Sequence, residues 1–281
     1  MNTLLEWLLP YTFSPGTVAF FVLVAAWYVR GVRRLRAAGR APSVWRQLSF
    51  WLGLLLCYAV LHTRFDYFSQ YMFFMHRIQH LVLHHVGAFL IALANPLPAF
   101  RAGAPQRFTP KHPLVRALRP LALILQQPLV AAVLFVGLVF FWLIPEIHFE
   151  AMLSHNRYML MNWSMFLDGV LFWLLILDPR PPKQTAHMPG HGVRFAMLWA
   201  TAFPQIILGA WITLGPADIY DVYSVCGRAW PMSPHTDQVL GGVFTWIPPG
   251  MMTVLASLLV LRMALRDSEA TASSHPAQRR P

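Results

Sequence analysis

The chain has 281 residues, of which 57% are hydrophobic and only 12% carry a charged side chain. Soluble domains are about 45–50% apolar and about 25% charged, so this composition excludes an ordinary soluble enzyme and a disordered chain, and the presence of only two cysteines excludes a disulfide scaffold. The formal charge of +11 does not indicate a nucleic-acid partner, because the basic residues lie in short runs between long apolar segments. A polytopic membrane protein is the class that remains.

Seven apolar segments are candidates for crossing a bilayer, whose hydrocarbon core takes roughly 20 helical residues. In chain order they are Thr17–Val29, Leu48–Leu61, Tyr71–Ala94, Leu118–Leu143, Tyr158–Leu177, Val193–Leu214 and Val239–Leu261. We therefore expect an all-α fold with seven transmembrane helices in one domain, residues 1–266. The polar residues 267–281 are expected to form a disordered cytoplasmic tail.

Basic residues gather in every second connection, which predicts the orientation. Arginine and lysine are concentrated in residues 30–46, 101–119 and 180–194 and in the tail, whereas the other connections carry mainly acidic residues. Because basic connections stay in the cytoplasm, we expect the N-terminus outside and the C-terminus inside. The third, fifth and seventh spans then all begin at the outer face.

The third span begins with side chains that bind metals. His76 and His80 are four residues apart, so both imidazoles lie on one helix face and can reach one metal ion. Met72 and Gln79 share that face. Imidazole alone suits Cu(II) or zinc, whereas imidazole combined with a thioether favours Cu(I).

Similar side chains begin the fifth and seventh spans. His155, Met159 and Asn162 share a face of the fifth span, and Asp237 and Gln238 precede the seventh. We therefore expect a copper site, most readily for Cu(I), at the outer helix ends. Its candidate ligands are His76, His80, His155, Asp237 and Met72, and its supporting residues are Gln79, Gln238, Met159 and Asn162.

Several other polar residues inside the spans admit two interpretations. Arg77 and Asp168 are costly in a bilayer and typical of functional positions. Arg77 is expected to pair with a carboxylate such as Asp66 or to extend outward, and Asp168 fits a buried hydrogen bond as well as a functional role. His84 and His85 fit either an interhelical hydrogen bond or a functional site, whereas His148 in an outer connection is expected to be solvated.

Three motifs resemble those of the CtaG-type (caa3-type) cytochrome c oxidase assembly factors. Residues 75–81, with the sequence MHRIQHL, are similar to the family's M-H-x-x-Q-H-L signature. Residues 169–173, GVLFW, resemble its G-x-L-F-W motif, and residues 237–246, DQVLGGVFTW, resemble its D-Q-x-x-G-G…W motif. The three occur in the family's order.

This resemblance implies a non-enzymatic assembly factor of the bacterial inner membrane that supports copper delivery to the catalytic subunit of a haem–copper oxidase. Its expected partners are that subunit, a periplasmic copper donor and the lipid bilayer. The resemblance points to His76, His80, Asp237 and Gln238, and also to His155. The family often has a second histidine two turns into the fifth span, where this chain has Asn162.

A haem protein with two histidine ligands is the alternative function, because paired membrane histidines can serve as axial ligands. An i,i+4 pair on one helix cannot occupy opposite faces of one haem, so a haem would need His76 or His80 opposite His155 or His62. A retinal photoreceptor is excluded because Lys111 and Lys183, the only lysines, lie in predicted cytoplasmic connections.

Overall fold

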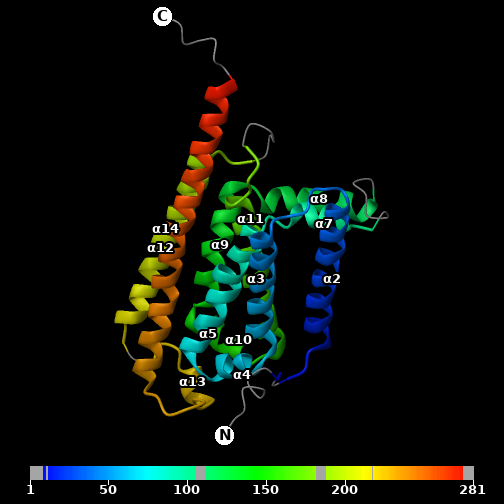
Figure 1. Cartoon of the computed structure of the whole chain (residues 1–281). Helices are drawn as coiled ribbons and strands as arrows, with labels where there is room; N and C mark the ends of the chain where they lie inside the picture. Colours follow the sequence, from blue (N-terminus) through cyan, green and yellow to red (C-terminus); the bar gives the residue numbers. More distant parts are fainter. Residues whose placement is uncertain (1–8, 11, 106–111, 182–187, 217, 275–281) are drawn as a thin grey trace, which may run out of the picture.

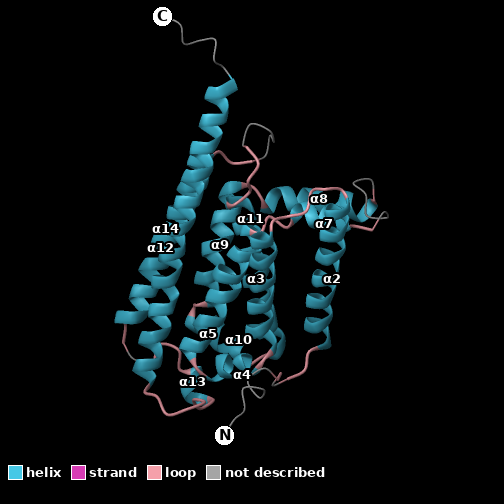
Figure 2. Ribbon diagram, in the orientation of Figure 1, coloured by secondary structure: helices cyan, strands magenta, loops and turns pink. Residues whose placement is uncertain are grey.

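The structure is a computed structural model that describes residues 9–10, 12–105, 112–181, 188–216 and 218–274. Within these residues the secondary structure is entirely helical (Figure 2). Five helices are long and apolar enough to cross a membrane. They are α2 (Pro15–Ala37), α3 (Val44–His62), α11 (His155–Ile176), α12 (His191–Leu214) and α14 (Pro234–Ser274).

Two further spans come from bent helix pairs. The third span consists of α5 (Phe73–His80), the π-helix η1 (Leu81–Val86) and α6 (Gly87–Leu93), and the chain then bends by 71° into α7 (Leu97–Gly103). The fourth contains α8 (Pro113–Leu125) and α9 (Pro128–Trp142), bent by 76°. Counting each pair as one span gives seven, so the prediction of an all-α polytopic membrane protein is confirmed.

The predicted span Leu118–Leu143 is not one continuous helix. The chain turns at Gln127, whose backbone is extended at φ −70° and ψ 129°. Pro128 causes this turn, because a proline disfavours the helical conformation in the residue before it. The side chain of Gln127 then accepts a hydrogen bond from Val130 N and caps α9.

Short helices close the two ends of the bundle. Figure 1 shows α4 (Arg64–Tyr71), α10 (Pro145–Met152) and α13 (Val222–Val225) at one end, and α7 and α8 lying across the other. The positive-inside prediction makes the first end extracytoplasmic. The histidine-bearing α5 begins at this end and packs against α4 and α14.

Helix α14 continues beyond the predicted end of the domain. It is helical to Ser274, so the expectation of disorder is wrong for residues 267–274, while residues 275–281 lie outside the described residues. Two physical reasons support the extension. The segment is a continuation of an already formed helix, which avoids the cost of nucleation, and Asp267 contacts His191 of α12 at 2.9 Å.

Candidate functional site

Four histidines of the third span face the interior of the bundle. His76, His80, His84 and His85, here called the histidine column, are each at most 4% exposed. Successive residues of an α-helix are about 100° apart around its axis. The π-helix η1, which contains His84 and His85, changes this angle, and such turns occur frequently at functional sites.

His76 is a fully buried imidazole with no hydrogen-bond partner on either ring nitrogen. Its ring centre lies 4.3 Å from that of His80 and 5.2 Å from that of His148. Buried polar groups are normally paired, and a single unpaired one costs about 1–3 kcal/mol. A fully buried imidazole that retains a free nitrogen lone pair is therefore a candidate ligand-binding group.

His80 has a partner on each side of its ring. Its Nε2 lies 3.0 Å from the Asn162 Oδ1 atom, and its Nδ1 lies 3.3 Å from an Arg77 Nη1 atom. An amide oxygen only accepts and a guanidinium only donates. This fixes the proton on Nε2 and leaves the Nδ1 lone pair directed to Arg77. The amide nitrogen of Asn162 has no partner.

Arg77 is only 3% exposed, so it does not extend outward. It donates from Nε to Thr245 Oγ1 at 2.9 Å and contacts His80. The expected pairing with Asp66 is also not found, because Asp66 is bound instead to Gln70, Gln79 and Tyr158. The column therefore has a buried positive charge beside its second imidazole.

The second half of the column, His84 and His85, lies farther along the third span and has different partners. His84 Nε2 lies 3.1 Å from Asp168 Oδ2, and His85 Nε2 lies 3.2 Å from Gln205 Nε2. The Nδ1 atoms of both histidines are unpaired. A cavity of about 10 Å³ adjoins His80, His84 and His85, which is room for one water molecule.

The G-x-L-F-W motif packs against this π-helix. A Cβ atom on Gly169 would lie 2.6 Å from the His84 carbonyl oxygen, so only glycine permits this approach of α11. Trp173 Nε1 donates to the same carbonyl at 3.0 Å. The motif thus holds the backbone where the helix changes its winding.

Asp237 anchors the beginning of α5. It is fully buried and accepts hydrogen bonds from Phe73 N at 3.1 Å, Phe74 N at 2.9 Å and Arg228 Nε at 3.0 Å. The Phe73 and Phe74 groups are backbone amides at a helix N-terminus, which attracts a negative charge. The carboxylate therefore fixes the start of the helix that carries His76.

Gln238, the next residue, connects α14 to the last turn of α12 and to the segment that follows it. Its Oε1 accepts from Ile219 N at 2.7 Å, and its Nε2 donates to Pro216 O at 2.7 Å and Ile212 O at 3.2 Å. All its bonds are to backbone groups of another segment. The D-Q pair thus fastens two different pieces of chain to the beginning of α14.

Gln79 belongs to a polar network at the end of the bundle that α4 closes. It donates to Asp66 Oδ1 at 2.9 Å and to Val60 O at 2.8 Å, and it accepts from the Tyr158 hydroxyl at 3.0 Å. Burial raises the pKa of Asp66 to about 6, against the opposing effect of the hydrogen bonds from Tyr158, Gln79 and Gln70 and of the charge of His155. Asp66 therefore titrates only slightly below neutral pH.

The structure does not bring every predicted ligand into the buried cluster. His155 is exposed at the first residue of α11, and Met159 is half-buried on the same helix. Met72 is fully buried at the break between α4 and α5, one turn before His76. Within the described residues, no group of three or more His, Cys, Asp or Glu side chains is arranged to hold a metal ion.

His148 was expected to be solvated and is instead fully buried beside His76. It lies in α10, outside the spanning helices, with Nδ1 3.0 Å from Trp142 O and Nε2 3.0 Å from the Tyr223 hydroxyl. Burial lowers its pKa to about 3, so the ring is neutral and donates from Nδ1 to the carbonyl. Pro145 is the sequence signal that could have predicted helix α10, because proline is favoured at the first position of a helix.

The fold and this cluster define a multi-pass helical membrane protein with a buried histidine column on its third span. A family model described as "Cytochrome c oxidase caa3 assembly factor (Caa3_CtaG)" matches residues 26–267, and the chain belongs to this family. The resemblance seen in the three motifs is therefore confirmed.

One curated relative is the uncharacterised protein ML1998 of Mycobacterium leprae (strain TN). The two are 24% identical over 261 residues, which cover 89% of this chain and 39% of that protein. The chain thus spans about two fifths of the length of this relative. No solved structure matches the chain.

Proposed function

We propose that this protein supports the assembly of a haem–copper cytochrome c oxidase by binding copper, as cargo, at the extracytoplasmic end of the histidine column. Family membership supports a role in oxidase assembly. The single observation that carries the copper assignment is His76, whose imidazole is buried with both nitrogens free. The protein would act as a binding factor without catalysis, in the inner membrane of a bacterium.

The pair His76 and His80 fits a two-donor site. A metal–imidazole bond is about 2 Å long, so two rings whose centres lie 4.3 Å apart can reach one ion with small rotations. Met72, buried one turn earlier, is a soft third donor of the kind that favours Cu(I). We assign the primary ligand to His76 and the second to His80.

The surroundings of His80 favour transfer over permanent storage. To bind copper, His80 must release either Arg77 or Asn162, because both ring nitrogens are in use. The buried charge of Arg77 also opposes a second cation close by, an effect that is strong where the dielectric is low. Both effects lower affinity, which suits a factor that receives copper from a periplasmic donor and passes it to the oxidase catalytic subunit.

His155 and Asp237 have different places in this proposal. His155 is exposed at the extracytoplasmic end, where it can meet copper before the buried pair does. Asp237 is engaged by three donors, so its contribution is to hold α5. Gln79, Asn162 and Gln238 orient their neighbours through hydrogen bonds.

The copper assignment is tested by titrating the purified full-length protein with Cu(I) against a competing chelator. We expect His76→Ala to weaken binding by at least about tenfold, or 1.4 kcal/mol, and His80→Ala to weaken it less. The matched control is His235→Ala, an exposed histidine at the same end. Unchanged affinity and stoichiometry in the double variant of His76 and His80 would reject the site.

An optical spectrum of the same preparation distinguishes the haem alternative from the copper proposal. Bound haem would give a Soret band that is lost in His76→Ala or His80→Ala. The cavity beside His80 holds only about one water molecule, and both nitrogens of the neighbouring His148 are occupied. These observations favour copper.

The role in assembly is tested in a strain that lacks the protein. Oxidase copper content and activity are measured with and without added copper, after complementation by the native chain or by His76→Ala. We expect low oxidase copper in the deletion strain and incomplete rescue by the variant. Full rescue by His76→Ala would reject copper handling while retaining an assembly role, and normal oxidase in the deletion strain would reject both.

A further inference from the structure

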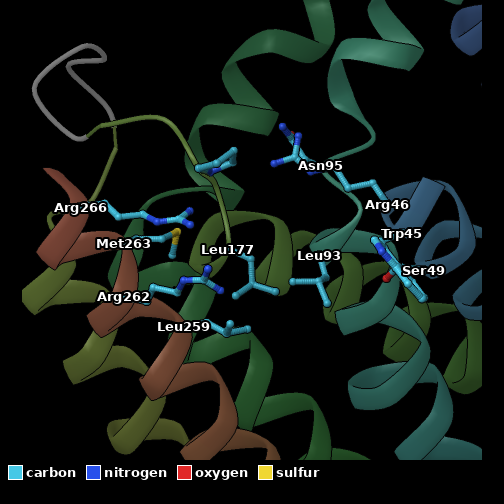
Figure 3. A pocket seen from close by; sticks show the side chains of 11 residues that line it. Trp45, Arg46, Ser49, Leu93, Asn95, Leu177, Leu259, Arg262, Met263 and Arg266 are labelled. Atoms are coloured by element: carbon cyan, nitrogen blue, oxygen red, sulfur yellow. The ribbon is translucent and has the colours of Figure 1, made fainter. Parts of the chain in front are cut away.

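A second polar site lies at the opposite end of the bundle from α4, α10 and α13. It is a pocket of about 300 Å³ between the beginning of α3 and the later part of α14, and its floor includes the ends of α6 and α11 (Figure 3). The positive-inside prediction places it at the cytoplasmic surface. None of its residues belongs to the histidine column.

The pocket combines a basic rim with an apolar floor. Figure 3 shows Arg46 on one side and Arg262 and Arg266 on the other, with aliphatic side chains between and below them. Arg262 and Arg266 are four residues apart, so they project from the same face of α14. The apolar lining consists of Leu93, Leu177, Leu259 and Met263.

The three rim arginines make no ion pair with a carboxylate of the described residues. Two nearby acids are already bound: Asp178 pairs with Arg180 at 2.6 Å, and Asp267 contacts His191 at 2.9 Å. Three exposed guanidinium groups around one pocket repel each other, and an anion seated between them would relieve this repulsion. Guanidinium binds phosphate through two parallel hydrogen bonds, which makes phosphate the best-fitting anion.

The apolar floor distinguishes a lipid from a soluble phosphate compound. A free phosphate has no apolar part to place on Leu259 and Met263, whereas an acyl chain buries itself on them. Trp45, which lines the pocket and is 81% exposed, is typical of a residue at the membrane–water boundary. Basic pockets between transmembrane helices at the cytoplasmic surface bind anionic lipid headgroups.

We propose that this pocket binds one anionic phospholipid, with its phosphate between Arg46, Arg262 and Arg266 and an acyl chain along Leu259 and Met263. The lipid bridges α3 and α14, which are far apart in the sequence. The site is independent of copper binding. An anionic lipid bound in this pocket is a specific ligand of the protein, unlike the lipids of the surrounding bilayer.

The experiment measures lipid retention by native mass spectrometry on the full-length protein. The protein is purified in detergent and supplied with phosphatidylglycerol, cardiolipin or phosphatidylcholine. The test variant is Arg46→Gln with Arg262→Gln and Arg266→Gln. The matched control removes three exposed arginines of the same end outside the pocket, as Arg33→Gln, Arg36→Gln and Arg101→Gln.

We expect the native chain and the control to retain one anionic lipid and little phosphatidylcholine, and the test variant to bind it at least about tenfold more weakly. Met263→Trp, which keeps all charges and fills the floor, should also reduce retention. Equal loss in the control, or equal retention of phosphatidylcholine, would overturn the proposal. So would full displacement of the lipid by millimolar inorganic phosphate, which would indicate a plain anion site.

The melting temperature in phosphatidylcholine distinguishes a loss of folding in the test variant from a specific loss of lipid binding. We expect the test variant and the control to melt at the same temperature. If they do not, Met263→Trp alone decides: retained lipid in that variant overturns the proposal. If the test variant retains the lipid but no longer binds the oxidase subunit, the pocket is a binding site for a protein partner. That result would also overturn the lipid proposal.

Discussion

Asp237→Ala is the perturbation that best separates an anchoring carboxylate from a metal ligand. The substitution removes the acceptor for Phe73 N, Phe74 N and Arg228 Nε, all within 3.1 Å of a fully buried carboxylate. It leaves the amides at the start of α5 unpaired. The helix that carries His76 and His80 then loses its fixed beginning.

The magnitude follows from the contacts that are lost. Loss of an N-terminal cap costs about 0.5–2 kcal/mol, and a hydrogen bond between charged groups contributes about 1.5–3 kcal/mol. Together they predict destabilisation of about 2–5 kcal/mol for Asp237→Ala. Asp237→Asn keeps an oxygen that accepts from the two amides and loses the attraction to Arg228, so we expect roughly half that cost.

The assay is unfolding of the purified protein in detergent, followed by helical circular dichroism. At about 2–5 kcal/mol the melting temperature of Asp237→Ala should fall by roughly 10 °C. The matched control is Asp221→Ala, an exposed aspartate of the same region, which should stay within about 0.5 kcal/mol of the native chain. An Asp237→Ala protein as stable as this control would refute the anchoring role.

Copper affinity measured on Asp237→Asn gives the second half of the test. If Asp237 only anchors α5, the folded variant should bind Cu(I) as the native chain does. A loss of copper binding in a variant that remains folded would place the carboxylate among the ligands instead.

Two further predictions concern Asp66 and Gly169. Because burial raises the pKa of Asp66 from 3.8 to about 6, the folded state holds its proton more tightly. Stability should therefore fall by roughly 3 kcal/mol in total as the pH rises from about 3 to 7, with about 2 kcal/mol of this between pH 4 and 6. Asp66→Asn should flatten this part of the curve, and an unchanged slope would contradict the assignment. Gly169→Ala forces a Cβ atom to within 2.6 Å of the His84 carbonyl and should destabilise the protein by about 1–3 kcal/mol. Gly137→Ala, which meets nothing within 4 Å, should be neutral or stabilising, and equal melting temperatures of the two variants would show that the close approach is not required.

The sequence by itself determined the all-helical membrane class and the shared inward face of the first two histidines. Hydropathy and helical spacing are local properties, and they remain valid whatever the rest of the chain does. An i,i+4 pair such as His76 and His80 shares a helix face in any fold. The order of three short motifs likewise identified the family before any geometry was known.

The roles of individual site residues depended on contacts between distant segments. Asp237 binds amides that lie 163 and 164 residues away, and no local pattern shows that these donors occupy its oxygens. The burial of His148 and the exposure of His155 were likewise decided by how α10 and α11 pack at the bundle end. Sequence spacing fixes which side chains one helix presents together, whereas only the packing of helices decides which of them meet a partner.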